Sequence, residues 1–154
     1  MYRHASDGSS VGRSSADRGF SLVELMAVVA IIAILASVAI PSYRDYVIRG
    51  ALTDAMSNLA TKRIQNEQWY QDSRTYVGST GCIPDTTTSK LFEFSCSIQT
   101  ATSYTLQAIG KGNAAGFTFT LNQSNSMATP AVPTGTGWST SNNCWTKRKG
   151  TDPC

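Results

Sequence analysis

Residues 19–40 read GFSLVELMAVVAIIAILASVAI, and Pro41 follows. From Phe20 to Ile40 there are 21 residues, which as a helix would extend about 31 Å. That length is enough to cross a bilayer core of roughly 30 Å. The segment therefore predicts a membrane-spanning helix. It carries one acidic residue near its start, Glu24, where a carboxylate costs a few kcal/mol unless it is paired or neutral.

The residues that precede this segment form a polar leader. Residues 1–19 contain almost no large apolar side chains and carry three arginines and two aspartates. A cleaved secretory signal would need small residues and a cleavage site after its apolar core, and residues 37–39, Ser-Val-Ala, match such a site weakly. A membrane anchor fits better, because the helical pattern continues through Pro41 without a sign of processing.

After Pro41 the sequence becomes amphipathic. Apolar residues recur at helical spacing, which is typical of a helix that packs one face on a core; they are Ile48, Ala51, Leu52, Ala55, Met56 and Leu59. Lys62 and Arg63 interrupt this stripe. We expect one helix over residues 20–71, about 78 Å long, in which Pro41 marks a helix break, because a proline removes a backbone hydrogen bond and kinks or loosens the helix.

The remaining sequence predicts strands. Residues 91–98, 104–109 and 116–121 alternate apolar and polar side chains to different degrees, and residues 110–113 form a turn signal. The order is therefore one long helix, a loop and an antiparallel meander of three or four strands. Strands packed on the amphipathic half of the helix would give an α+β fold with a single core.

Composition limits the classes of function. The chain has 154 residues, 15% charged residues and a net charge of +3, so it suits one domain, and bulk charge does not argue for nucleic acid. Its one histidine, His4, lies in the leader, and its carboxylates form no visible acid pair. We therefore expect no catalytic residues, no metal site and no cofactor.

All four cysteines follow the apolar segment, at Cys82, Cys96, Cys144 and Cys154. An even number on the outer side of a membrane favours disulfides, and the spacing lacks the paired motif of a zinc site. Three pairings are possible. We favour Cys82–Cys96 and Cys144–Cys154, which close two short loops, the second of which ties down the end of the chain.

The start of the helix resembles that of the type IV pilins. Residues 19–25, GFSLVEL, the apolar run and residues 41–43, Pro-Ser-Tyr, match the family's motif. The resemblance implies that prepilin peptidase cuts between Gly19 and Phe20 and methylates the new amino group of Phe20. Cleavage would remove 19 residues, leaving 135 with 10 basic and 8 acidic residues, a net charge of +2.

Later segments are similar to PilE-like minor pilins; they are residues 45–46, 49–50, 67–68, 70–72, 74–76, 94–96, 104, 116–117 and 144–145. The resemblance implies the pilin ladle, a long N-terminal helix packed on a small antiparallel sheet. It divides the chain into a leader peptide (1–19), a transmembrane or filament-core half-helix (20–41) and a globular pilin domain (42–154). The precursor would lie in the bacterial inner membrane, and the mature chain in a cell-surface pilus.

The implied function is that of a minor pilin that supports pilus biogenesis, twitching motility and adhesion. The implied partners are other major and minor pilins, prepilin peptidase and the inner-membrane assembly platform. In the filament, Glu24 would pair with the free amino group of a neighbouring subunit's Phe20, because both charges are costly when unpaired in an apolar environment. The alternatives are a major pilin and a pseudopilin of type II secretion.

A third alternative is a DNA-binding pilin for natural transformation. Lys147, Arg148 and Lys149 lie between two cysteines and beside Trp145. Such a loop could contact a DNA backbone and stack a base. The competing interpretation is a solvated loop, because three charges are few.

Overall fold

A computed structural model describes residues 19–150 and Cys154. It divides the chain into two compact units at Ala39 and Ile40, two residues before the boundary expected from the sequence. Except for Gly19, the expected leader, which includes His4, lies outside the described residues.

Helix α1 runs over Leu22–Ser73 and belongs to both units. Its bounds differ by two residues at each end from the expected residues 20–71. The apolar part of α1 is exposed over its whole length, and it makes α1 long and apolar enough to cross a membrane.

Pro41 lies inside α1, and helical residues continue on both sides of it, as expected for one helix through this region. Proline lacks one N–H donor, so it removes one helical hydrogen bond, and the neighbouring turns keep theirs. A loosening of this turn during assembly stays a prediction.

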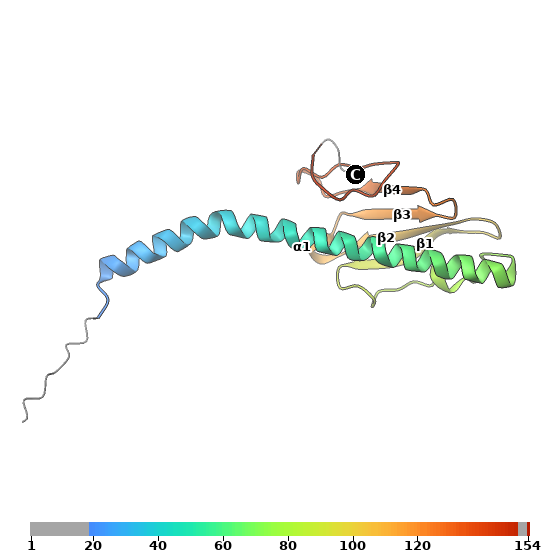
Figure 1. Cartoon of the computed structure of the whole chain (residues 1–154), viewed down its shortest axis with the longest axis horizontal. Helices are drawn as coiled ribbons and strands as arrows, with labels where there is room; N and C mark the ends of the chain where they lie inside the picture. The colour runs from blue at the N-terminus through green and yellow to red at the C-terminus, as the bar shows by residue number, and fades with distance from the viewer. Residues whose placement is uncertain (1–18, 151–153) are drawn as a thin grey trace, which may run out of the picture. The chain divides into compact units, whose positions relative to one another are not determined.

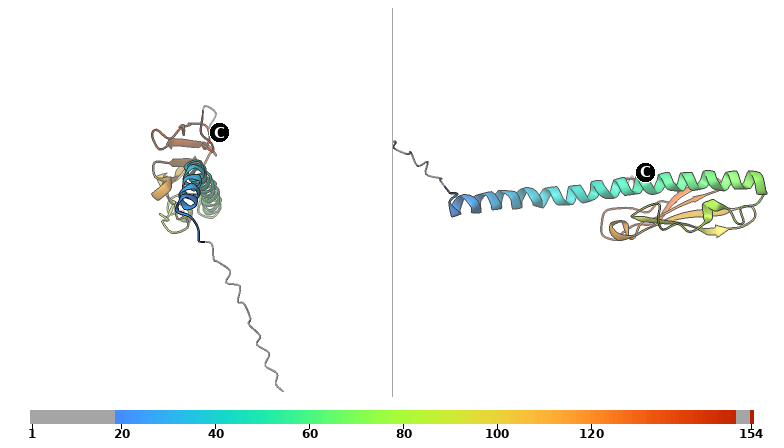
Figure 2. Two further views of the ribbon diagram at one scale, coloured as in Figure 1. Left: turned by 90° about the vertical axis from the view of Figure 1, so that its left-hand side faces the viewer. Right: turned by 90° about the horizontal axis from the view of Figure 1, so that it is seen from below.

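In the second unit, four strands form one antiparallel sheet in the order β1-β2-β3-β4. They are β1 (Phe92–Gln99), β2 (Tyr104–Gly110), β3 (Thr118–Asn122) and β4 (Met127–Ala131). The sheet lies along the part of α1 that belongs to the same unit (Figures 1 and 2). The α+β fold and the meander are thus confirmed, and β4 is the fourth strand that the sequence left open.

The core lies between α1 and the sheet. The predicted stripe supplies the helical side, since Leu52, Ala55, Met56 and Leu59 are buried. The sheet supplies alternate residues of β1, β2 and β3, whose fully buried members are Phe92, Phe94, Tyr104, Leu106, Ala108, Phe119 and Leu121. Period-two burial on the strands and helical burial on α1 meet in one apolar cluster, as an α+β core requires.

The helical stripe does not stop at Lys62, which is a correction to the sequence-based expectation. Lys62 is buried on the core face, its Nζ lies 3.0 Å from Oδ2 of Asp85, and it approaches the ring of Phe94 at 5.7 Å. Hydrogen bonds from the side chain and backbone of Thr88 and from Lys62 hold the pKa of Asp85 well below its usual range. A long lysine stem packs on apolar surface while its ammonium reaches a partner.

The end of α1 carries a second polar cluster. The carboxylate of Glu67 accepts hydrogen bonds from the hydroxyl of Tyr76 at 3.0 Å and from that of Tyr104 at 2.8 Å. Burial and then the Glu67 carboxylate raise the pKa of Tyr76 to about 12, and the same causes raise the pKa of Tyr104. One residue earlier, the buried Asn66 accepts a hydrogen bond from Ser79, which fixes the loop after α1.

Two tryptophans of the second unit differ in their burial. Trp69 is half-buried and lies outside the core cluster, with its ring near Gly78 of the loop after α1. Trp138 is 7% exposed and meets the ring of Phe117 edge-on, with the ring centroids 5.2 Å apart. Both positions depend on loops whose course the sequence pattern does not reveal.

Candidate assembly segment and basic loop

The first candidate site is the assembly segment, residues 19–40. Phe20 is 81% exposed, and every large apolar side chain from Leu22 to Ile40 is exposed as well. Exposed apolar side chains in such a continuous run mark a surface that lies in a membrane or against another protein.

The beginning of α1 holds Glu24 in the first helical turn. The backbone N–H of Glu24 donates to Oγ of Ser21 at 3.2 Å, so Ser21 caps the helix. A carboxylate in the first turn is favoured by the helix dipole. The spacing Ser21-x-x-Glu24 is a capping-box signal, and the sequence interpretation above did not use it.

The second candidate site is the basic loop, residues 137–150, in the other unit. Disulfides join Cys144 to Cys154 and Cys82 to Cys96, with Cα atoms 5.9 and 4.9 Å apart, which is the pairing favoured from the sequence. The backbone N–H of Gly150 donates to the carbonyl of Gly137 at 3.1 Å, so the ends of the basic loop meet. Both glycines have a positive φ, which other residues rarely adopt.

Thr146 and Lys149 are among the residues that anchor the basic loop to the rest of the unit. Thr146 is buried; its backbone N–H donates to Oγ1 of Thr129 on β4, and its hydroxyl donates to the carbonyl of Ser139. Lys149 donates to both carboxylate oxygens of Asp45 on α1, each at 2.9 Å, and its Nζ lies 6.0 Å from the ring of Trp138. Lys147 and Arg148 lie between these anchors and are exposed.

This geometry separates three cations that the sequence had grouped together. Lys149 forms an ion pair with Asp45, and the side chains of Lys147 and Arg148, which directly precede it, are exposed. The partner, Asp45, lies 104 residues earlier, and no local motif could have revealed it.

The structure fixes Trp145, the aromatic side chain beside these cations, on the sheet. Its indole N–H donates to the carbonyl of Thr120 on β3 at 2.8 Å, and its ring packs against the core. A ring fixed in this way holds the basic loop on the sheet.

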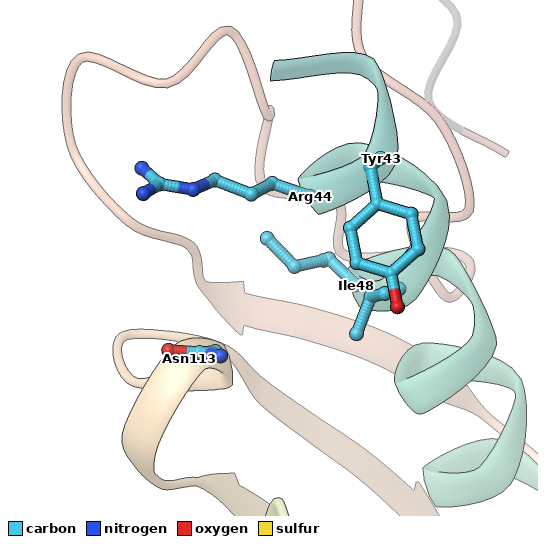
Figure 3. A pocket seen from close by; sticks show the side chains of 5 residues that line it. Tyr43, Arg44, Ile48 and Asn113 are labelled. Atoms are coloured by element: carbon cyan, nitrogen blue, oxygen red, sulfur yellow. The ribbon is translucent and has the colours of Figure 1, made fainter. Parts of the chain in front are cut away.

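A cavity of about 450 Å³ opens beside α1 in the same unit (Figure 3). Tyr43, Arg44, Val47 and Ile48 line it from α1, and Asn113 lines it from the turn between β2 and β3. The lining combines aliphatic side chains with one phenol, one guanidinium and one amide. Among the described residues, histidine, cysteine and carboxylate side chains form no cluster that could hold a metal ion.

Comparisons with known proteins match two family models to the chain. Residues 14–40 match the prokaryotic N-terminal methylation motif. Residues 41–120 match a family described as type IV minor pilin ComP, DNA uptake sequence receptor. The second model covers just over half of the chain.

Individual relatives are fimbrial proteins. A fimbrial protein of Pseudomonas aeruginosa is 44% identical over 64 residues, which are 42% of either chain. A probable minor fimbrial protein of Dichelobacter nodosus is 39% identical over 61 residues, 40% of this chain and 38% of the relative. The matches thus span about two fifths of these curated relatives.

The fold has a counterpart among solved structures. The non-core minor pilin PilV of Neisseria meningitidis superposes with a TM-score of 0.51 at 18% identity, over 59% of this chain and 94% of that chain. At this identity the likeness concerns the fold alone.

Proposed function

The chain belongs to the type IV pilins, in a family of minor pilins, and from this membership we propose that it is a structural subunit of a type IV pilus. In this proposal it is made as a precursor in the bacterial inner membrane and enters a cell-surface filament through its assembly segment. It would support pilus biogenesis, twitching motility and adhesion by a structural role without catalysis.

The observation that carries the proposal is the combination of the methylation motif with an apolar helical segment that is exposed throughout. In the precursor, lipid would cover this segment. In the filament, the helices of neighbouring pilins would cover it, so it would never face water.

Processing would prepare the segment for this transfer. Prepilin peptidase would cut between Gly19 and Phe20 and methylate the new amino group. The assembly platform would then lift the subunit, and Glu24, which is exposed in the first turn of α1, would pair with the amino group of a neighbouring subunit's Phe20.

Quantitative mass spectrometry of sheared pili tests this proposal. A low, nonzero ratio to the commonest subunit, with methylated Phe20 at the N-terminus, is expected for a minor pilin. A ratio near one would indicate a major pilin, and absence from the sheared fraction would favour a pseudopilin.

A variant pair tests the role of Glu24. Glu24→Gln should reduce incorporation into pili strongly, because it removes the charge that would pair with the Phe20 amine. Glu93→Gln is the matched control, since Glu93 is an exposed carboxylate on β1, outside the assembly segment. Equal incorporation of both variants would contradict the proposed pairing.

DNA binding is the second candidate function, and two observations favour it. The matching family is described as a DNA uptake sequence receptor, and the basic loop presents Lys147 and Arg148 between two anchors. Two neighbouring exposed cations suit contacts to successive phosphates of a backbone.

Fluorescence anisotropy with a labelled duplex tests this candidate. Lys147→Gln with Arg148→Gln should weaken binding and lower the slope of log K against log salt by about one to two. The matched control, Arg74→Gln with Lys90→Gln, removes the same charge from exposed positions outside the basic loop. Equal losses in both double variants would remove the basic loop from the proposal.

A further inference from the structure

The position of Asp45 raises the question of whether this residue strengthens or weakens the binding of a polyanion. Asp45 is an acidic residue on α1 that lies against the basic loop, with both oxygens 2.9 Å from Nζ of Lys149. By charge alone, a carboxylate at this place should repel a polyanion and weaken its binding.

The contacts of Lys149 indicate the opposite effect, in which Asp45 strengthens the binding of a polyanion. Its Nζ meets Asp45 on one side and approaches the ring of Trp138 at 6.0 Å, and Trp138 is held against Phe117 of the core. Lys149 follows directly after the exposed pair Lys147 and Arg148. The ion pair at Lys149 therefore restricts where the two preceding side chains can lie.

We propose that Asp45 is a positioning residue for polyanion binding, which fixes the basic loop through Lys149 so that Lys147 and Arg148 are held ready for a phosphate backbone. This inference rests on the DNA-binding candidate above. Lys149 neutralises Asp45, so the ion pair adds little net charge to the surface. Its contribution is order, because a loop that is already ordered loses less conformational entropy on binding.

The exposure of the ion pair determines how much affinity for a polyanion is lost when the pair is removed. The side chains of Lys149 and Asp45 are 35% and 36% exposed, so water and salt screen their attraction. A pair of this kind contributes at most about a fivefold factor to an equilibrium. We expect affinity changes of about threefold to fivefold from its loss.

The test measures duplex binding by the full chain in detergent micelles at low salt, with a labelled DNA duplex of mixed sequence. Asp45→Asn and Lys149→Met should each weaken binding about threefold to fivefold, and the double variant should be no weaker than either single one, since both remove the same tie. Asp45→Glu should retain most of the affinity. Asp54→Asn is the matched control; it removes one exposed carboxylate of α1 nine residues away, and binding should stay equal or become slightly tighter.

The sign of the Asp45→Asn effect decides the proposal. Charge alone predicts tighter binding for Asp45→Asn and weaker binding for Lys149→Met, so that pattern would overturn the positioning role and leave DNA binding intact. If Lys147→Gln with Arg148→Gln has no effect on binding, the DNA-binding role of the basic loop fails, and the positioning role falls with it.

A readout without DNA separates positioning from general destabilisation. Amide hydrogen exchange at residues 147–150 should accelerate in Asp45→Asn, while exchange in β1 and β2 stays unchanged. Equal acceleration throughout the sheet would show that Asp45 acts on global stability and would overturn the proposal.

Discussion

Two lysine–aspartate pairs connect α1 to distant segments, and they differ in their access to water. Lys62 on α1 pairs with Asp85 at 3.0 Å, and these side chains are 11% and 17% exposed. Asp45 on α1 pairs with Lys149 at 2.9 Å, and these side chains are 36% and 35% exposed. Each lysine also lies over an aromatic ring, and each pair accompanies a disulfide-closed loop.

The same chemistry therefore has two consequences. The Lys62–Asp85 pair is largely desolvated, so removing one partner leaves a buried charge without compensation. The Asp45–Lys149 pair is half-exposed, so it contributes little to stability and mainly determines where the basic loop lies. The comparison predicts that perturbations near the first pair affect folding more than matched perturbations near the second.

The largest difference is expected from the disulfides. Replacing Cys82 and Cys96 with alanine should cost about 3–5 kcal/mol, because the disulfide closes a loop and Cys82 is buried in the core. Replacing Cys144 and Cys154 should cost about 3 kcal/mol or less, because their disulfide lies outside the core.

Urea unfolding in detergent, followed by tryptophan fluorescence, measures both costs. All three tryptophans lie in the second unit, so the signal reports on the globular part. A larger loss from the C-terminal pair would contradict the comparison.

Replacing the lysines should give the next largest difference in the free energy of unfolding. Lys62→Met should lower the free energy of unfolding by about 2–3 kcal/mol, because Asp85 stays largely buried and loses its cation while keeping its threonine donors. Lys149→Met, the matched control, should cost less than about 1 kcal/mol. The same urea experiment compares the two variants. Equal losses in the free energy of unfolding would show that the difference in exposure does not affect stability.

Acid should reveal the desolvated pair in a third experiment. Because folding lowers the pKa of Asp85, its contribution to stability is present above the unfolded pKa of about 4 and is lost as the pH falls below it. Asp85→Asn should be less stable at pH 7 and should lose less stability between pH 5 and pH 2. Asp45→Asn serves as the control, and an identical acid dependence in both variants would exclude Asp85 as the source.

The sequence predicted those parts of the fold that rest on local periodicity. The helix and three strands follow from apolar spacing, and the short disulfide loops follow from cysteine spacing. The strand β4 was not predicted, because it has only five residues and includes Pro130, which lacks the backbone N–H that donates a hydrogen bond to a neighbouring strand. Cleavage between Gly19 and Phe20 and the pairing of Glu24 stay predictions.

The details of the basic loop could not be predicted, for a physical reason. Lys149 looked like a third phosphate contact because its partner, Asp45, is 104 residues away. Lys62 looked like an interruption of the core stripe because Asp85 lies in a loop without a regular pattern. In both cases the tertiary partner decides what a lysine does, and only the folded chain reveals that partner.

Salt gives the smallest expected effect and separates the two pairs most directly. At 1 M salt the Debye length falls to about 3 Å, so the attraction between half-exposed charges is largely screened. The stability difference between the wild-type chain and Lys149→Met, below about 1 kcal/mol at low salt, should then vanish. The difference for Lys62→Met should persist, since little water or salt reaches that pair. Urea unfolding at both salt concentrations measures this; if both differences vanish together, water reaches the two pairs equally and the distinction between them is lost.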